Sequence, residues 1–221
     1  MHIVKGNKIV EFTPKDLVDL MQEYVSVEVD IGTGDGALPY KKAQINKGTL
    51  YIGIDPIEKQ MLKFSKKALR NKIKNALFIV GNAENLGEVF GEYVGLVNTV
   101  HILFPWGSLL KAVAQPDAVV LEKIYSILKA QGQLNIVLGY DETAEPSEVK
   151  RLNLQTPDEA YFEREAFPVY RRCGFALEKF VRVGRENPDY LTTSWMKKLR
   201  FGKTRSFFEL KFNKQTPGII T

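Results

Sequence analysis

Residues 27–36 read VEVDIGTGDG, an apolar and β-branched run that passes into three glycines at alternate positions. The first half is typical of a buried strand, and the glycines predict a tight turn that opens a helix. Glycines there let the backbone pass close to a ligand and adopt φ values closed to other residues. The next apolar run, YIGID at residues 51–55, also ends in an acid. This order of a strand, a glycine-rich turn, a helix and a second strand predicts a nucleotide-binding βαβ unit.

The two acids of this unit distinguish two classes of cofactor. Asp55 ends the second strand, where a carboxylate accepts both ribose hydroxyls of a dinucleotide or of S-adenosylmethionine. Asp30 precedes the glycines and lies beneath the turn. A carboxylate at that place would repel a pyrophosphate, whereas it can hold the cationic amino acid end of S-adenosylmethionine. Asp30 therefore favours S-adenosylmethionine.

Strand-like and helix-like segments alternate outward from this unit. A hairpin over residues 3–12, turning at Gly6 and Asn7, precedes a helix with Thr13 as N-cap and Pro14 at its first position. The expected strands are residues 25–31, 49–54, 76–80, 94–103, 133–138, 175–183 and 206–212, and the expected later helices are residues 36–46, 57–72, 85–93, 115–130 and 157–173. The alternation predicts an α/β fold with a doubly wound parallel sheet, in one domain over residues 1–221.

Composition excludes several classes of protein. The chain has 221 residues, of which 44% are hydrophobic and 26% charged, enough for one sizeable core. It has no uninterrupted apolar run of about 18 residues and no cleavable targeting signal at its start, so we expect a cytoplasmic protein. Cys173 is its only cysteine, and His2 and His101 are its only histidines. We therefore expect neither an internal disulfide nor a metal site.

The net charge of +5 is unevenly distributed. Residues 1–150 hold 17 Lys and Arg against 18 Asp and Glu, whereas residues 151–221 hold 14 against 8. Within the first part, residues 59–74 still contain seven basic residues and no acid. Either cluster alone is equally typical of a solvated helix face. Two basic clusters far apart in the sequence nevertheless suggest one polyanion-binding face.

The glycine pattern at residues 30–36 together with Asp55 resembles the class I S-adenosylmethionine-dependent methyltransferases. This resemblance implies that the group to be methylated is presented at the end of the fourth parallel strand, which reads TVHILFPWG at residues 99–107. The Asn or Asp followed by two prolines and an aromatic, which is usual for methylation of an exocyclic amine, is missing. Cys173 lies far along the chain without a preceding proline, so C5 methylation of a pyrimidine does not fit either. Phe104, Pro105 and Trp106 instead offer an aromatic surface for a flat base. A ring nitrogen such as adenine N1 has an in-plane lone pair and needs only positioning.

A second tryptophan, Trp195, lies in a basic insertion over about residues 184–205, before the last expected strand. Leu191, Trp195 and Leu199 are also spaced like the buried stripe of an amphipathic helix. The run ILFPWG at residues 102–107, Trp195 and the ending FGKTRSFF at residues 201–208 together resemble the aminoglycoside-resistance 16S rRNA (adenine-1408-N1)-methyltransferases, the KamB and NpmA family. The resemblance extends over nearly the whole chain.

This resemblance implies a Rossmann-like, seven-stranded class I methyltransferase fold with an N-terminal β-hairpin (about residues 1–12) and an antiparallel last strand. It implies S-adenosylmethionine as cofactor, held by Asp30, Gly32, Gly34, Gly36, Asp55, Ala83, Glu84 and Ser108. It places the target adenine between Trp106 and Trp195, beside Phe104 and Pro105. The rRNA-docking residues would be Lys66, Lys67, Arg70, Lys72, Lys74, Lys198, Lys203 and Arg205.

The implied partners are 16S rRNA and the 30S ribosomal subunit, and we expect a monomer that binds neither membrane nor DNA. The chain departs from the family pattern at two positions, Ala37 and Lys198, where relatives often have arginine. Lysine keeps the charge but cannot form the bidentate hydrogen bonds that arginine makes to phosphate, so both departures concern RNA affinity.

Three alternatives remain open from the residues alone. A tRNA (guanine-N7)-methyltransferase shares the fold and a similar run, but with an extra residue and a second proline before the tryptophan. A non-catalytic RNA-binding factor could keep the fold as a scaffold, although the intact acids and glycines argue against it. A small-molecule methyltransferase would not need two basic clusters.

Overall fold

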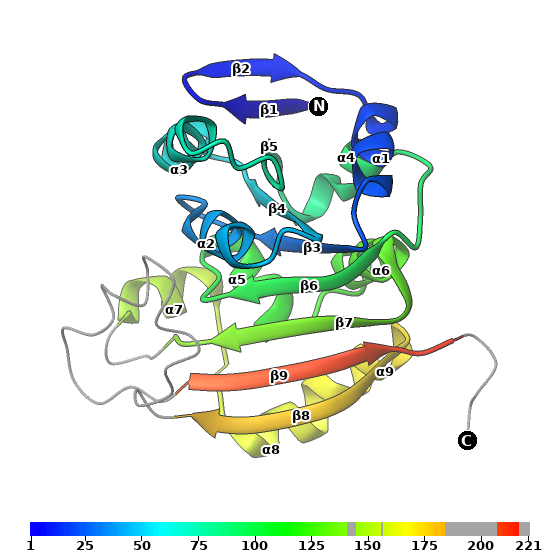
Figure 1. Ribbon diagram of the computed structural model, residues 1–221. Helices are drawn as coiled ribbons and strands as arrows, with labels where there is room; N and C mark the ends of the chain where they lie inside the picture. The colour runs from blue at the N-terminus through cyan, green and yellow to red at the C-terminus, as the bar shows by residue number, and fades with distance from the viewer. Residues whose placement is uncertain (141–144, 156, 184–206, 217–221) are drawn as a thin grey trace.

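The computed structural model describes residues 1–140, 145–155, 157–183 and 207–216. Within these residues nine strands form one sheet, in the order β2-β1-β5-β4-β3-β6-β7-β9-β8 (Figure 1). The strands are β1 (His2–Lys5), β2 (Lys8–Glu11), β3 (Ser26–Ile31), β4 (Thr49–Asp55), β5 (Ala76–Val80), β6 (Val97–Leu103), β7 (Leu128–Leu138), β8 (Phe175–Val183) and β9 (Phe207–Lys214).

The sheet consists of a seven-stranded core and an added hairpin. Strands β5, β4, β3, β6 and β7 are parallel, and β9 runs antiparallel between β7 and β8. The hairpin of β1 and β2 joins antiparallel to β5. The class I methyltransferase fold, the hairpin and the reversed last strand are therefore confirmed, and the hairpin accounts for the two strands beyond seven.

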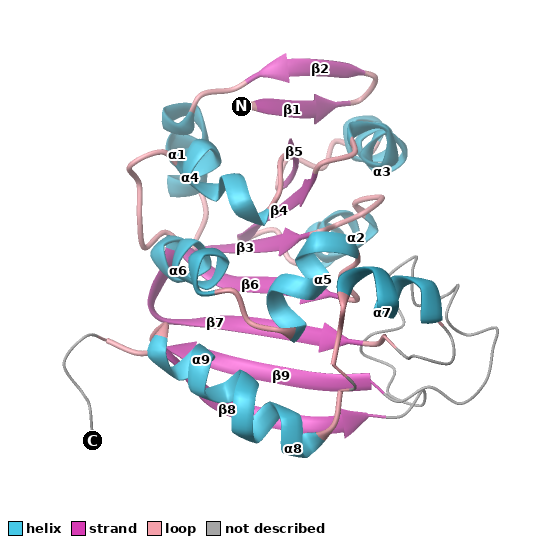
Figure 2. Ribbon diagram, turned by 180° about the vertical axis from the view of Figure 1, so that it is seen from behind, coloured by secondary structure: helices cyan, strands magenta, loops and turns pink. Residues whose placement is uncertain are grey.

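Helices cover both faces of the sheet (Figures 1 and 2). Helices α2 and α3 lie on one face, and α5, α6, α8 and α9 lie on the other. The helices are α1 (Pro14–Gln22), α2 (Ala37–Ile45), α3 (Glu58–Arg70), α4 (Leu86–Phe90), α5 (Gly107–Ala114), α6 (Ala118–Ile127), α7 (Pro146–Leu152), α8 (Glu159–Tyr161) and α9 (Phe167–Arg172), with a 3₁₀ turn at Ala83–Asn85 and a π-helical turn at Phe162–Ala166. None of these described helices combines the length and apolar character that a bilayer span requires.

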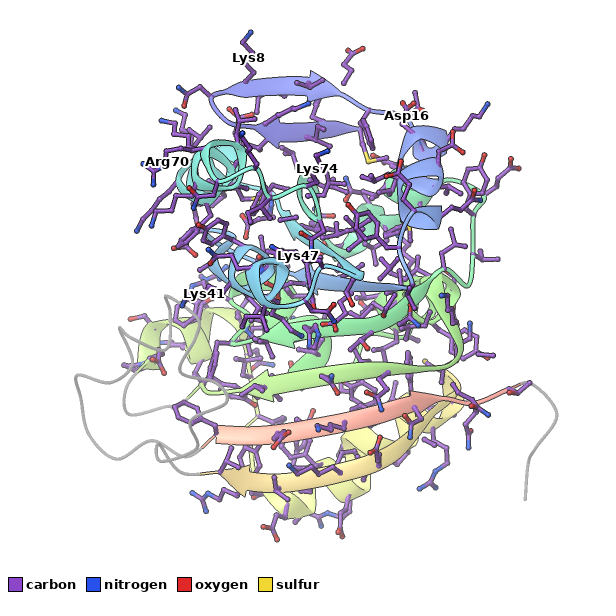
Figure 3. The ribbon with its side chains drawn as sticks, in the orientation of Figure 1. Lys8, Asp16, Lys41, Lys47, Arg70 and Lys74 are labelled. Atoms are coloured by element: carbon purple, nitrogen blue, oxygen red, sulfur yellow. The ribbon has the colours of Figure 1, made fainter. Side chains whose placement is uncertain are left out.

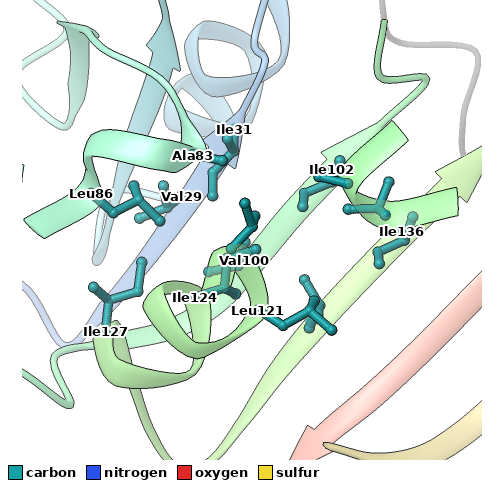
Figure 4. Packing of buried hydrophobic residues seen from close by; sticks show 14 of the residues in the cluster. Val29, Ile31, Ala83, Leu86, Val100, Ile102, Leu121, Ile124, Ile127 and Ile136 are labelled. Atoms are coloured by element: carbon teal, nitrogen blue, oxygen red, sulfur yellow. The ribbon is translucent and has the colours of Figure 1, made fainter. Parts of the chain in front are cut away.

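Alternation along the strands divides the core between the two faces. The larger cluster lies beneath α5 and α6, where Val29, Val100 and Ile136 of neighbouring strands pack against Leu121 and Ile124 (Figure 4). A second cluster beneath α2 and α3 contains Tyr40, Met61, Phe64 and Phe78. Sheets of this kind bind ligands at the carboxyl ends of their parallel strands, so the site is expected there.

The helix expected over residues 115–130 is wrong at both ends. Helix α6 spans Ala118–Ile127, and β7 begins at Leu128 without an intervening turn. The register of β7 against β6 shifts between the Val97–Leu128 and Thr99–Gln133 pairs, so the extra residues form a bulge at Gln131, which has φ +60°. Helices α5 and α7 were not expected from the sequence.

The helix expected over residues 157–173 is interrupted. The π-helical turn separates α8 from α9, and Pro168 stands at the start of α9. Proline lacks the N–H that would continue the regular hydrogen-bond pattern, and the wider turn accommodates it. The strand Phe175–Val183 that follows has the expected bounds.

Candidate active site

The glycine turn adopts a conformation that side chains would obstruct. Gly32 has φ +75°, and a Cβ there would lie 2.8 Å from Cδ2 of Leu109 in α5. Gly36, the N-cap of α2, has φ +76°, and its Cβ would lie 2.5 Å from the ring of Phe78. The turn is therefore packed directly between α5 and the α2–β5 cluster. This packing brings the end of β3 beside the start of α5.

Asp30 lies at the carboxyl end of β3 with only 7% of its surface exposed. The Thr33 hydroxyl donates a hydrogen bond to its Oδ2 at 2.6 Å. Burial raises the pKa of Asp30 to about 7, and the Thr33 hydrogen bond only partly opposes that rise. A ligand ammonium placed against this carboxyl group would favour its ionised form.

Asp55 organises the neighbouring loop from the end of β4. Its Oδ2 accepts a hydrogen bond from the Gly34 N–H at 2.9 Å, and its Oδ1 accepts one from the Ile57 N–H at 2.9 Å. Burial raises the pKa of Asp55, and these two hydrogen bonds oppose the rise. A carboxylate offers about four lone-pair positions, so the remaining ones can accept ribose hydroxyls.

Ala83 and Glu84 follow β5 in the 3₁₀ turn. Ala83 is buried, and its side chain belongs to the larger cluster. Glu84 is exposed, and its carbonyl oxygen accepts a hydrogen bond from Nζ of Lys123. Asn82 caps this turn by exchanging hydrogen bonds with Asn85.

The loop after β6 carries two aromatic residues, of which Phe104 is buried and Trp106 is exposed. Phe104 has φ +52° and is 7% exposed, and its ring packs edge to face against Phe207 of β9 at 5.2 Å. Pro105 is buried as well. Trp106 is 47% exposed and is the N-cap of α5, where exposed Ser108 follows. The expected stacking surface therefore reduces to Trp106, because Phe104 serves the core.

The basic residues after β4 gather on α3 and at its end. Lys66, Lys67 and Arg70 lie on α3, and Lys72 and Lys74 lie in the connection to β5. Lys72 has φ +54°, a conformation in which glycine is the usual residue. Lys67 lies 4.9 Å from the ring centroid of Phe64. Three of the five thus lie on the helix that covers one face of the sheet, and the other two follow it in the chain.

Comparison with known proteins decides the family. The profile of NpmA, described as 16S rRNA (adenine(1408)-N(1))-methyltransferase, matches residues 2–213. The chain belongs to this family. A 16S rRNA (adenine(1408)-N(1))-methyltransferase from Escherichia coli is 32% identical over 95% of this chain and 97% of its own length.

Solved structures agree with this family. The 30S ribosomal A1408 methyltransferase from an uncultured bacterium is 36% identical, with a TM-score of 0.75 over 97% of this chain and all of that one. The 16S rRNA methyltransferase KamB is 26% identical, with a TM-score of 0.85 over 98% of this chain and all of that one. A tRNA (guanine-N(7)-)-methyltransferase from Macrococcus caseolyticus is 25% identical over only 57% of this chain and 61% of its own length.

In this NpmA-family chain, the structure adds a residue that sequence reasoning missed. Glu148 of α7 accepts a hydrogen bond from the Gly107 N–H at 3.2 Å. Arg151 holds the same carboxylate through two hydrogen bonds, of 2.8 and 2.7 Å. Hydrogen bonding by Arg151 lowers the pKa of Glu148, so it is ionised at neutral pH. Glu148 therefore anchors the residue directly after Trp106.

Sequence reasoning also missed a partly buried cluster of Glu28, Lys42 and His101 beside the glycine turn. Nε2 of His101 in β6 lies 2.9 Å from Oε2 of Glu28, and Nζ of Lys42 pairs with that same oxygen. These residues line a small cavity with Asp30 and Tyr51. The alternation of β3 places Glu28 on the face of Asp30, which is the signal that could have found the cluster.

Four residues with predicted roles in base stacking or rRNA docking lie outside the described residues, namely Trp195, Lys198, Lys203 and Arg205. Their roles stay predictions. The described part of the chain has no group of three His, Cys, Asp or Glu residues placed to hold a metal ion.

Proposed function

We propose that this protein transfers a methyl group from S-adenosylmethionine to N1 of adenine 1408 of 16S rRNA, within the 30S subunit, and so confers aminoglycoside resistance. One observation carries the proposal most directly. Exposed Trp106 begins α5, whose Leu109 touches the glycine turn that follows Asp30. A base-stacking side chain thus stands beside the expected methyl donor in a chain of the NpmA family.

The donor set of the site fits S-adenosylmethionine. Asp30 offers a carboxyl group to the ammonium, and Asp55 keeps lone pairs for the ribose hydroxyls. Gly32 and Gly36 leave the backbone open where side chains would collide with Leu109 and Phe78. When bound, the cofactor supplies an electrophilic methyl group. We also propose that Gly34, Ala83, Glu84 and Ser108 contact the cofactor.

Positioning supplies the proposed rate enhancement. Adenine N1 carries its own lone pair, so no general base is required, and holding two reacting groups in line can lower a barrier by about 7 to 11 kcal/mol. Extruding the base from its helix costs a few kcal/mol. Stacking on Trp106, and on Trp195 as the second face, offsets that cost with about 1 to 3 kcal/mol per stack. The rings would also stabilise the positive charge of the methylated base.

Docking on the ribosome is assigned to the basic residues. Lys66, Lys67 and Arg70 of α3, with Lys72 and Lys74, present positive charge to phosphates. Lys198, Lys203 and Arg205 would complete this surface. We propose that residues 1–221 act as one domain and as a monomer, on RNA rather than DNA, in the cytoplasm where 30S subunits reside.

Primer extension on 16S rRNA tests the proposal directly. We expect 30S subunits incubated with enzyme and S-adenosylmethionine to give one reverse-transcriptase stop at the modified adenine, because a methyl on N1 blocks base pairing. Reactions without cofactor are the control. Methylation of transfer RNA with no stop on 16S rRNA would instead support the guanine-N7 alternative, which the shorter match favours less.

A growth assay tests the resistance. We expect expression of the chain to raise the concentration of an A-site aminoglycoside needed to stop growth, and expression of Trp106→Ala at equal level not to do so.

A further inference from the structure

The turn of the N-terminal hairpin is fixed to α3 by one serine. Oγ of Ser65 accepts a hydrogen bond from the Gly6 N–H at 2.8 Å and donates one to the Val4 carbonyl at 2.7 Å, and both bonds are buried. Gly6 has φ +66°, and a Cβ there would lie 2.9 Å from Cδ2 of Leu69. The turn therefore packs directly on the helix that carries Lys66 and Arg70.

Two positively charged lysines, Lys5 and Lys8, flank this turn. Lys5 and Lys8 are directly opposite each other in the register of β1 and β2, and both are exposed. Like charges at opposed positions destabilise a strand pair. Neither lysine forms an ion pair with any residue that the structure describes. Glu11, the acid of β2, pairs in register with His2 at the opposite end of the hairpin.

The neighbouring helix adds to this charge. Lys63, Lys66 and Arg70 of α3 are exposed, and they too lack ion-pair partners within the described ranges. Figure 3 shows Lys8 beyond the hairpin, and Arg70 beside α3 on the same side of the molecule. The acid of α3, Glu58, lies in its first turn, whereas Ser65 and Leu69 contact the hairpin from the second half. Positive charge thus continues from the helix onto the turn.

We propose that the hairpin turn, through Lys5 and Lys8, is a second phosphate-binding element of the rRNA-docking surface, held in register with α3 by Ser65. This inference rests on the proposed function. Lysine binds phosphate as a point charge without demanding a fixed fork geometry, which suits contacts to an RNA backbone. A bound polyanion would relieve the repulsion between Lys5 and Lys8, which no acidic neighbour among the described residues relieves. This accounts for two like charges at opposed positions of the hairpin.

Equilibrium binding of the full chain to 30S subunits over a range of salt concentrations tests the proposal. We expect the double variant Lys5→Gln/Lys8→Gln to bind several-fold more weakly at low salt. Its plot of log affinity against log salt should be shallower by about 0.9 for each phosphate that the variant no longer neutralises, the value for a DNA duplex. Its affinity for S-adenosylmethionine should be unchanged. Lys5→Arg/Lys8→Arg should restore both affinity and slope.

A matched control makes the same change of charge elsewhere. Lys15 of α1 and Lys47 before β4 are exposed and lie away from the turn, so Lys15→Gln/Lys47→Gln should leave the slope unchanged. If both double variants lower affinity equally, the hairpin has no special role and the inference is wrong. If Lys66→Gln/Arg70→Gln weakens binding while the hairpin variant keeps wild-type affinity and slope, the inference fails and the proposed function stands. Absence of methylation at adenine 1408 by the wild-type chain would instead overturn the proposed function.

Discussion

The Gly34 N–H donates a hydrogen bond to Oδ2 of Asp55 at 2.9 Å, joining the turn after β3 to the end of β4. The acid expected to bind ribose therefore also fixes the glycine turn. Because Asp55 holds the Ile57 N–H with its other oxygen, one side chain shapes both loops at the edge of the sheet. Substitutions at the cofactor site should consequently change both the cofactor's hydrogen bonds and the loop geometry.

We expect Asp55→Ala to weaken binding of S-adenosylmethionine by about 10- to 150-fold. A hydrogen bond to a charged group contributes about 1.5 to 3 kcal/mol, and here the loop also loses its anchor. Isothermal calorimetry measures this affinity. Asp19→Ala, which removes an exposed acid from α1, is the matched control and should bind normally. Wild-type affinity in Asp55→Ala would overturn the assignment of this acid.

Cofactor affinity should depend on pH through Asp30. Burial raises the pKa of Asp30 to about 7, so the carboxylate that receives the ammonium forms only as the pH rises through that value. Affinity should therefore increase as the pH rises from 5.5 through 7 and should level off only above that value. Asp30→Asn should bind weakly with no such rise. A wild-type affinity that is constant over this range would contradict the ammonium contact.

Trp106→Ala should slow methyl transfer while cofactor binding survives. Loss of one base stack of about 1 to 3 kcal/mol corresponds to a rate about 5- to 150-fold lower. Trp106→Phe should keep part of the activity, and Trp195→Ala should behave like Trp106→Ala. Single-turnover methylation of 30S subunits measures the rate.

The neighbouring Phe104 provides the contrast for Trp106. Phe104→Ala should lower the free energy of unfolding by about 3 to 5 kcal/mol, because its ring is buried against Phe207. Trp106→Ala should leave the melting temperature nearly unchanged, since the indole is half exposed. A Trp106→Ala protein that is unfolded, or stable and fully active, would show that the indole is not a base platform.

Glu148→Gln should lower the rate of methyl transfer without changing affinity for S-adenosylmethionine. The neutral amide is a weaker acceptor for the Gly107 N–H, so the Trp106 loop is held less firmly. Arg151→Gln breaks the ion pair but keeps the carboxylate on Gly107, and it should retain most of the activity. Equal loss in both variants would point to a general effect of α7.

Acid should destabilise the protein through Glu28. Burial favours the neutral acid, but hydrogen bonds from His101 and Lys42 outweigh it and lower the pKa of Glu28 to about 2. The stabilisation is present above the ordinary value of 4.5 and is lost as the pH falls toward 2. Urea midpoints between pH 6 and pH 3 should fall more steeply for the wild type than for Glu28→Gln. If the urea midpoints of the wild type and of Glu28→Gln fell equally with pH, Glu28 would not be the source of the acid sensitivity.

Local signals in the sequence were sufficient for the βαβ unit and the hairpin. The glycine turn, Asp30, Asp55 and the capping residue Thr13 all act through neighbouring residues, and the structure has each in the expected element. The start of β7 could not be predicted, because its pairing with β6 through a bulge overrides the helical pattern of residues 115–130. The roles of Glu148 and Ser65 could not be predicted from local sequence, because each accepts a hydrogen bond from a distant residue. Glu148 and Gly107 are 41 positions apart, and Ser65 and Gly6 are 59 positions apart.

The added hairpin determines which strand lies at this outer edge of the sheet. Without β1 and β2, the outer strand of the sheet would be β5, whose ALFIV sequence would offer unpaired backbone groups to other molecules. The edge is instead β2, four exposed residues with a charge at each end. A chain truncated before α1 should therefore aggregate through β5, which is a reason to test docking with point substitutions rather than by deletion.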